Sequence, residues 1–464
     1  MRLIAYMKPY AHWVIFALLL VLGLTAFDLY RPMLVGDAID TFGANGDYDV
    51  IIATAIKYAV VLALSFAFNI AQTWILQKTG QNIILQMRKD LYRHIQSLGS
   101  RYFDITPVGK LVTRVTNDVE ALNEMYSGIL VQLFRNIVKI VGLAGVMLVL
   151  DVRLAAISFV LMPLVIGLTV LCQKIARNIY RLYRTRLTDI NTFLSEHLSG
   201  MKIIQIFGRQ ERKFEEFHDK NTKLYKAFYR EMLMYAVFRP LIYILSILSL
   251  MIVLWFGSRN VFDEIISVGT LYIFSNYIRS FFDPIQELAE QFSTLQSSIA
   301  SAEKIFTVMD EDEFIPEVEN PKQPDKITGK IEFDHVWFAY DGENYVLKDV
   351  SFVINPGEKV AFVGATGAGK SSILNLIGRY YDIQKGHIYI DGIDIRQLSK
   401  KKLRSAIGQM QQDVFIFEGD VAYNIRLNDD DITDAQVKAA AEYVNASHFI
   451  EKLPQGYHEP VTER

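Results

Sequence analysis

The sequence contains a single cysteine, Cys172, so an intramolecular disulfide framework is excluded. Cys172 lies in an apolar stretch, which favours a buried small side chain over a reactive thiol. The eight histidines are scattered and show no spacing typical of a metal site. A disulfide-rich secreted domain and a histidine-based zinc protein are therefore not indicated.

The sequence also lacks a strong charge of either sign, with a formal net charge of -3 at pH 7. Hydrophobic residues make up 51% of the chain, and the long apolar runs fall in its first two thirds. The sequence pattern of the last third is typical of a soluble α/β domain. Nucleic acid is not an expected partner, because the basic residues cluster beside the apolar runs rather than in a separate patch. The length suits two or three domains.

Six apolar runs are each close to the ~20 residues that cross ~30 Å of hydrocarbon. They cover 13–36, 50–75, 128–150, 153–173, 236–257 and 266–288. The first run follows basic residues, as a signal peptide would, but it is too long and has no small-residue cleavage site. The sequence therefore predicts a multidomain membrane protein whose residues 1–312 form a six-helix, all-α transmembrane domain.

The distribution of Lys and Arg predicts the orientation of these spans. The loop after the first span carries Asp37, Asp40, Asp47 and Asp49 but no Lys or Arg. The segments after the second and fourth spans are rich in both, as cytoplasmic segments are. We therefore expect a multi-pass protein of the cytoplasmic (inner or plasma) membrane, with its N-terminus and its last third in the cytoplasm.

The two basic segments are far longer than the ~2–8 residues that usually connect helices. Apolar residues in both recur with a helical period. Helical arms of ~20 residues would project about 30 Å from the membrane. We expect such cytosolic helical extensions, with tips at 109–117 and 203–208 that touch a cytosolic domain; ordinary surface hairpins are the alternative.

Ionisable residues within the spans are candidates for function. Asp28 and Arg31 are three residues apart on one helical face, and we interpret them as a structural ion pair, with substrate contact as the alternative. Arg135 and Lys139 are expected to extend toward the cytoplasmic interface.

An aromatic stripe marks the sixth span, where Phe274, Tyr277 and Phe281 recur at helical spacing. Helix packing is the favoured interpretation of the stripe. A cavity wall for hydrophobic substrates is the alternative. Prolines in the fifth and sixth spans, Pro240 and Pro284, mark places where these helices are expected to bend.

A glycine loop organises the last third of the chain. It reads Gly364-Ala365-Thr366-Gly367-Ala368-Gly369-Lys370-Ser371-Ser372, after the apolar run 360–363 and before a helical pattern. Strand, loop and helix in that order are the context of a phosphate-binding loop, in which backbone N–H groups and the helix N-terminus face phosphate oxygens. Lys370 is expected to reach the β- and γ-phosphates and Ser371 to ligate Mg²⁺. The loop predicts nucleoside triphosphate binding; a fortuitous glycine turn is the alternative.

The residues around the loop have alternating patterns typical of strands. Residues 313–329 contain prolines among charges and are predicted to be a linker. Strands are expected at 330–338, 345–354, 359–363 and 387–390, a short helix at 400–405, and a further strand at 407–411. Residues 330–464 are thus predicted to form the N-terminal part of an α/β P-loop nucleotide-binding domain.

Further motifs surround the loop in a fixed order. They are Val336-Trp337-Phe338-Ala339-Tyr340, Gly386-His387-Ile388-Tyr389-Ile390-Asp391-Gly392, Leu403-Arg404-Ser405-Ala406-Ile407-Gly408 and Gln411-Gln412-Asp413, with Tyr102-Phe103-Asp104 and Thr116-Asn117-Asp118 in the first arm. With the phosphate loop, they make the whole chain resemble a half-transporter of the ABC exporter family, of the multidrug and lipid type. The resemblance implies ATP and Mg²⁺ as cofactors, and a second half-transporter, identical or different, as the partner.

The resemblance also implies roles for individual residues. Tyr340 matches the aromatic residue that stacks on adenine, with Tyr345 as the fallback. Gln412 matches the glutamine that senses Mg²⁺ and the γ-phosphate, and it would join Ser371 and Ser372 in the nucleotide and metal site. The family usually has proline where Gln411 stands, and Gln411 is the alternative for this role. The family's coupling helices correspond to the two predicted arm tips.

The sequence departs from the family pattern at its end. Val461-Thr462-Glu463-Arg464 resembles the stretch just before the family's signature sequence. The signature, the Walker B carboxylates and the switch histidine are expected beyond residue 464, so no catalytic residue is assigned within the chain. We expect the sequence to be a fragment, with an incomplete nucleotide-binding domain that would not hydrolyse ATP by itself.

If whole, the protein is expected to export hydrophobic or amphipathic substrates, drugs or lipids, across the bilayer by alternating access in a dimer. Two alternatives remain open. One is an ATP-binding but catalytically silent subunit of a heterodimer. The other is an ATP-regulated membrane protein that is not a pump.

Overall fold

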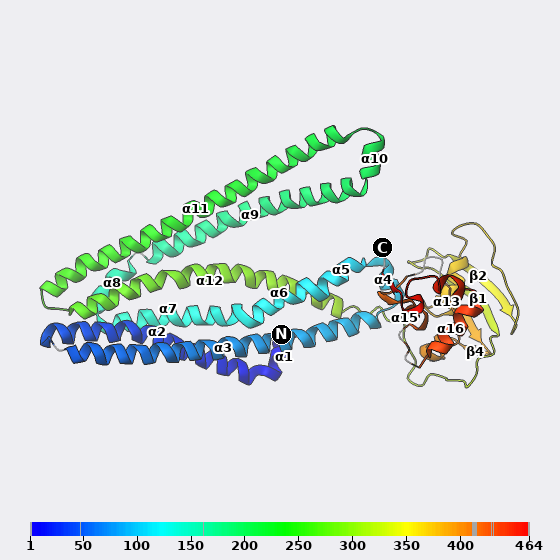
Figure 1. Cartoon of the computed structure of the whole chain (residues 1–464), viewed down its shortest axis with the longest axis horizontal. Helices are drawn as coiled ribbons and strands as arrows, with labels where there is room; N and C mark the ends of the chain where they lie inside the picture. Colours follow the sequence, from blue (N-terminus) through cyan, green and yellow to red (C-terminus); the bar gives the residue numbers. More distant parts are fainter. Residues whose placement is uncertain are drawn as a thin grey trace. The chain divides into compact units, whose positions relative to one another are not determined.

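The computed structural model describes residues 2–46, 48–160, 162–410, 415–427, 429 and 431–462. The chain divides into two compact units, Met1–Phe314 and Ile315–Arg464. The first unit consists of helices, whereas the second contains the sheets and the phosphate loop (Figure 1).

Long helices make up most of the first unit. They are α2 (Ala11–Asn45), α3 (Tyr48–Ser97), α7 (Leu130–Leu150), α9 (Met162–Ser199), α11 (Gln210–Phe262) and α12 (Val268–Met309). Shorter helical segments connect or extend them: α1 (Arg2–Met7), η1 (Lys8–Tyr10), α4 (Ser100–Ile105), α5 (Val108–Thr113), η2 (Arg114–Asp118), α6 (Val119–Glu124), η3 (Met125–Ile129), α8 (Val152–Phe159) and α10 (Met201–Ile206).

Five helical stretches of the described residues are long and apolar enough to cross a membrane. They are Arg2–Gly43, Tyr48–Ser97, Val108–Leu150, Val152–Ser199 and Gln210–Phe262. These stretches contain the first five predicted runs, and the chain is a multi-pass membrane protein. The sixth predicted run lies in α12, which is not among the five; Asn276, Arg279 and Asp283 make that run more polar.

The helices α9 and α11 run side by side as a long hairpin closed by α10 (Figure 1). The predicted second tip, 203–208, includes most of α10, and Ile203, Ile206 and Phe207 are exposed there. The predicted first tip, 109–117, lies in α5 and η2. The second tip is thus a short helix between two long ones, whereas 109–117 begins the continuous helical stretch Val108–Leu150, and the chain turns before it, around α4.

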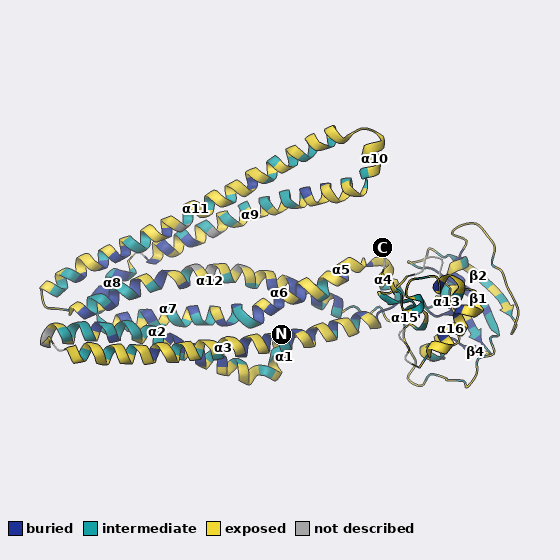
Figure 2. Ribbon diagram, viewed as in Figure 1, coloured by how far each residue is buried: buried dark blue, intermediate teal, exposed yellow. Residues whose placement is uncertain are grey.

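The aromatic stripe of α12 lies in the core of the first unit. Phe274, Tyr277 and Phe281 are buried in one hydrophobic cluster. The packing interpretation is therefore confirmed for Phe274 and Phe281, while Tyr277 both packs in this cluster and lines a cavity of the same unit. By contrast, large apolar side chains such as Phe66 and Trp74 are exposed along α3 (Figure 2). Such exposed apolar faces are expected where helices contact lipid.

The second unit is built on a four-stranded sheet of order β2-β1-β3-β4, in which all neighbours are antiparallel. The strands are β1 (Ile331–Phe338), β2 (Leu347–Ile354), β3 (Lys385–Ile390) and β4 (Ile393–Asp394). Phe333 of β1 lies opposite Phe352 on one side and Ile388 on the other, and the helix after the phosphate loop packs onto this sheet through Leu376.

The remaining elements of this unit are short. They are α13 (Lys370–Ile377), α14 (Lys400–Ser405), β5 (Gly419–Asp420), α15 (Val421–Arg426), α16 (Asp434–Tyr443), α17 (Ser447–Ile450), η4 (Gly456–His458) and β6 (Pro460–Val461). The predicted strands at 330–338, 345–354 and 387–390 and the helix at 400–405 are confirmed.

The prediction of a strand at 359–363 is wrong. A strand needs a neighbouring strand for its backbone hydrogen bonds, and among the described residues no strand pairs with this segment. Residues 407–410 likewise form no strand, and Gln411 lies outside the described residues.

The segment between the last long helix and β1 is hydrogen-bonded to other residues of the second unit. Arg379, whose side chain is 2% exposed, donates a hydrogen bond to the Pro316 carbonyl oxygen at 2.7 Å. The backbone N–H of Lys400 donates to the Glu317 carboxylate at 2.9 Å. The proline-rich segment therefore has a defined path, although it contains no helix or ladder strand of its own.

Candidate nucleotide-binding site

The phosphate loop turns sharply at two glycines. Gly367 and Gly369 both have a φ of +86°, a left-handed conformation that favours glycine. A Cβ at Gly369 would lie 2.7 Å from a Leu347 side-chain carbon, whereas a Cβ at Gly367 would meet nothing within 4 Å. Gly369 therefore fixes the close approach of the loop to the start of β2, and Gly367 leaves an open surface.

Lys370 begins α13 and reaches back across the loop. Its ammonium donates hydrogen bonds of 2.8 Å to the carbonyl oxygens of Gly364 and Ala365. Ala368 also donates its backbone N–H to the Ala365 carbonyl oxygen at 3.1 Å. The lysine thus holds the two ends of the loop together and places a positive charge over it.

The residues of the loop fit a phosphate group. Residues 363–368 are exposed, and no side chain caps the N-terminus of α13. Backbone N–H groups at an uncapped helix N-terminus, next to two left-handed glycines and one lysine, are a donor set suited to an anion. An amine with no acidic partner in the described residues adds to this preference.

The structure describes one of the two metal ligands that the sequence predicts, Ser371. The Ser371 side chain is exposed at the second position of α13, next to Lys370. Gln412 lies outside the described residues. Among the residues that the structure describes, no cluster of His, Cys, Asp or Glu could hold a metal ion alone. A divalent cation here would thus depend on oxygens of the bound phosphate and on Ser371, a ligand set that suits Mg²⁺.

Tyr340 lies beside the loop. Its hydroxyl donates to the Ser372 Oγ at 3.0 Å, and its ring meets those of Phe338 and Tyr381 edge-on at centroid distances of 4.7 and 5.0 Å. The structure therefore brings together Tyr340 and Ser372, which the sequence analysis had placed in one site. The fallback, Tyr345, packs edge-on against Trp337 at 5.2 Å instead.

Gln384 holds the backbone just before Tyr340. Its side-chain oxygen accepts from the Ala339 N–H, and its side-chain amide donates to the Ala339 carbonyl oxygen, both at 2.9 Å. Sequence reasoning missed this residue, because the pairing of 384 with 339 arises only when β3 folds beside β1. Gln384 is a positioning residue for Tyr340.

Two carboxylates at the β3–β4 hairpin have lowered pKa values. Burial acts to raise the pKa of Asp394, but hydrogen bonds from Arg396 and His387 outweigh it and lower this pKa to about 2. Burial also acts to raise the pKa of Asp391, whereas hydrogen bonds from Thr328 and the backbone after it lower this pKa below its usual value. Both side chains thus stabilise the hairpin in their ionised form, through the hydrogen bonds that they accept.

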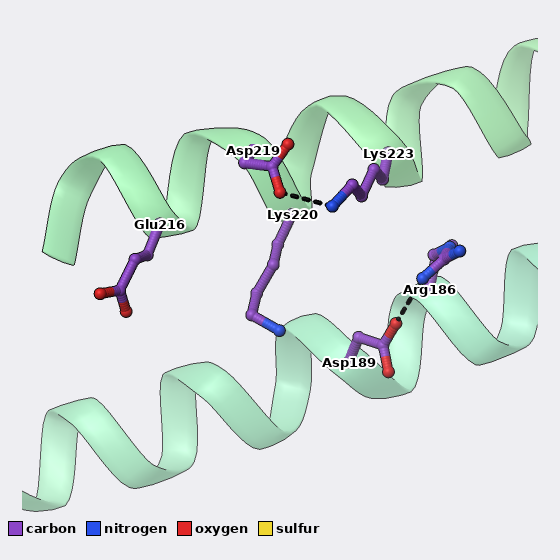
Figure 3. A pocket seen from close by; sticks show the side chains of 6 residues that line it. All are labelled: Arg186, Asp189, Glu216, Asp219, Lys220 and Lys223. Atoms are coloured by element: carbon purple, nitrogen blue, oxygen red, sulfur yellow. Dashed lines mark hydrogen bonds and ion pairs between the residues drawn. The ribbon is translucent and has the colours of Figure 1, made fainter.

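A small cavity of about 180 Å³, outside the nucleotide site, lies between α9 and α11 and is lined by charged side chains (Figure 3). Its lining residues are Arg186, Asp189, Glu216, Asp219, Lys220 and Lys223. Arg186 pairs with Asp189 at 3.1 Å and Lys223 with Asp219 at 2.6 Å, each along its own helix, while Lys220 extends from α11 toward α9. Because the acidic and basic side chains that line it are equal in number, we interpret these residues as polar contacts that stabilise the hairpin of α9 and α11.

Comparison with known proteins identifies both units. Residues 14–285 match the family described as ABC transporter transmembrane region, and residues 347–459 match the family described as ABC transporter. The chain is 37% identical, over 465 aligned residues, to the protein exp8 of Streptococcus pneumoniae, whose name places it among ABC transporter ATP-binding proteins; the match covers 100% of this chain and 79% of the relative.

Two further relatives have names that include a substrate. One is a fatty acid ABC transporter ATP-binding/permease protein of Mycobacterium bovis, 35% identical over 86% of this chain and 63% of its own. The other is an ATP-dependent lipid A-core flippase of Desulfotalea psychrophila, 30% identical over 95% of this chain and 77% of its own. With its transmembrane region fused to an ATP-binding domain, the chain belongs to the ABC transporter family, as a half-transporter of the exporter type that couples ATP to transport.

Proposed function

We propose that this half-transporter exports hydrophobic or amphipathic molecules, drugs or lipids, across the cytoplasmic membrane by alternating access in a dimer. The observation that carries the proposal is the phosphate loop closed by Lys370 in a chain whose other unit is a bundle of apolar helices. The names of the fatty acid transporter and the lipid A-core flippase support an amphipathic substrate.

We assign residues 1–312 to the transmembrane domain, 313–329 to the linker and 330–464 to the ATP-binding domain. The division between Phe314 and Ile315 supports this assignment. We also assign a sixth span to the first part of α12, because its stripe packs into the same core as the other spans. The charge distribution supports a cytoplasmic N-terminus and ATP-binding domain.

Within the nucleotide site, we assign the backbone from Gly364 to Gly369 and the Lys370 ammonium to the phosphates. Ser371 would hold Mg²⁺ together with Gln412, and the Tyr340 ring would stack on adenine. Bound Mg-ATP supplies the phosphoryl group whose transfer to water releases the free energy for transport. The residues of this chain bind and orient that group, and Gln384 keeps Tyr340 beside the loop.

A second half-transporter is the proposed partner. ABC half-transporters generally dimerise, and a single bundle of this kind supplies only half of a translocation pathway. ATP would then act as a ligand that favours one arrangement of the two halves and so shifts their equilibrium.

The experiment is ATP-dependent uptake of a fluorescent amphiphile into inside-out vesicles that contain the full chain and its partner half. We expect uptake with Mg-ATP and none without nucleotide. If every amphiphile tested were taken up equally with and without Mg-ATP, the proposal would be contradicted.

A further inference from the structure

Two adjoining polar cavities lie among the helices of the first unit. One, of about 310 Å³, is lined by charged residues Asp28, Arg31 and Lys139 together with tyrosines of α3 and α12. The other, of about 530 Å³, lies between α7 and α12. Lys139 lines both, so the two cavities adjoin at this residue. Together they have the size of sites that bind small ligands.

The first cavity has an excess of positive charge. The Asp28 carboxylate contacts the guanidinium of Arg31 and lies 3.5 Å from that of Arg135, so that one carboxylate serves two cations. The Nε of Arg31 is buried without a hydrogen-bond partner. Lys139 forms no ion pair with any residue that the structure describes. Arg135 lines the second cavity and Lys139 lines both, while their extension toward the interface stays a prediction.

The second cavity adds an acidic face. Asp283, Glu287 and Glu290 line it from α12, at the i, i+4, i+7 spacing that puts side chains on one face. Glu287 accepts a hydrogen bond from Asn136 at 3.0 Å. Asp283 and Glu290 have no cation within ion-pair distance among the described residues. This face therefore has carboxylates that form no ion pair with any cation the structure describes.

The basic and acidic groups line two cavities that share Lys139, and among the described residues neither Arg31 nor Lys139 pairs with a carboxylate of α12. Unpaired charges inside a membrane bundle are costly, and they usually mark a functional site. A purely anionic ligand would leave the α12 carboxylates unpaired, and a purely cationic ligand would leave Lys139 unpaired and Arg31 sharing the Asp28 carboxylate with Arg135. A ligand that carries both charges would neutralise both groups.

We infer that these cavities bind the headgroup of a zwitterionic amphiphile. Its phosphate or carboxylate would lie at Arg31 and Lys139, and its ammonium would lie at Asp283 and Glu290. This inference rests on the proposed export of amphipathic molecules and names their headgroup class.

Binding of three fluorescent amphiphiles with one tail tests the inference. The headgroups are phosphocholine, which is zwitterionic, a phosphate monoester and a quaternary ammonium. The full chain, in uncharged detergent, should bind the phosphocholine compound at least ~10-fold more tightly than either singly charged compound. The Lys370→Ala variant should show the same preference, because the measurement does not depend on ATP. Equal binding of the three, or preference for a singly charged compound, would overturn the inference.

Charge variants locate the site. Lys139→Gln should shift the preference toward the quaternary ammonium compound, and Glu290→Gln toward the phosphate compound, while Lys139→Arg should keep the original preference. Lys57→Gln is the matched control, since Lys57 is exposed on α3 and lines neither cavity. An unchanged preference in both Gln variants would exclude these cavities.

The two proposals can fail separately. ATP-driven uptake of amphiphiles without any headgroup preference would refute the inference and leave export intact. The expected preference in binding, without ATP-driven uptake of any compound, would refute export and leave the binding site intact.

Discussion

The ammonium of Lys370 lies 2.8 Å from the carbonyl oxygen of Gly364, six residues earlier in the chain. The lysine therefore closes the phosphate loop through the loop's own backbone. To bind a phosphate, it must exchange carbonyl oxygens for phosphate oxygens, so the affinity for nucleotide reflects the difference between these two sets of hydrogen bonds.

Lys370→Ala should weaken ATP binding strongly. Hydrogen bonds to charged groups contribute ~1.5–3 kcal/mol, which corresponds to roughly 10- to 100-fold in the dissociation constant. Titration with a fluorescent ATP analogue measures the change. Lys401→Ala, which removes an exposed lysine of the same unit, should bind normally. Wild-type affinity in the Lys370 variant would remove the lysine from the site.

Gly369→Ala should distort the loop. Its φ of +86° is unfavourable for alanine, and the new Cβ would lie 2.7 Å from the Leu347 side chain. A strained backbone position of this kind costs ~1–3 kcal/mol. We expect weaker nucleotide binding and a lower melting temperature than for Gly408→Ala, where a Cβ meets nothing within 4 Å. Equal behaviour of the two variants would show that the loop tolerates a side chain at 369.

Tyr340→Ala and Tyr340→Phe should separate the two contacts of this residue. The Phe variant loses the hydrogen bond to Ser372 but keeps the ring, whereas the Ala variant loses both. Aromatic contacts of this kind contribute ~0.5–1.5 kcal/mol, so Ala should raise the dissociation constant of ATP roughly 3- to 10-fold and Phe should raise it less. Tyr345→Ala should have little effect. The reverse ranking of Tyr340 and Tyr345 would move the adenine contact to Tyr345.

The second unit should lose stability in acid partly through Asp394. Its pKa is about 2 in the folded chain, below the value of ~3.9 in an unfolded chain. The unfolded chain therefore takes up this proton at higher pH, and the contribution of Asp394 to stability, complete above about pH 5, is lost as the pH falls toward 2. Asp394→Asn should lower the melting temperature at pH 6 and flatten its fall between pH 5 and pH 3. Asp325→Asn, at an exposed site, should do neither.

Local patterns were sufficient for much of this fold. Alternating apolar residues predicted β1 and β2, and the apolar runs predicted the long helices because hydropathy is a property of each segment alone. The segment 359–363 shows the limit, since a strand depends on a neighbour as well as on its own residues. The same contrast between local signals and long-range contacts holds for the nucleotide site. The glycine loop has a local signature, whereas the contact of Gln384 with Ala339 depends on how two distant strands pair.

The charged cavities show the limit most clearly. Arg135 and Lys139 near the end of a span fit the pattern of side chains that extend to the interface. That Arg135 pairs with Asp28 of α2, and that both residues line a cavity beside α12, depends on elements that approach only after the bundle has formed. No local pattern contains that information.

The most direct measurement is ATP-driven uptake of a fluorescent amphiphile into inside-out vesicles, compared between the wild-type chain and its Lys370→Ala variant, each assembled with its partner half. We predict uptake that requires Mg-ATP in the wild type and is lost in the variant. Uptake at the wild-type rate by a properly inserted Lys370→Ala protein would contradict the claim that ATP held at this loop drives transport.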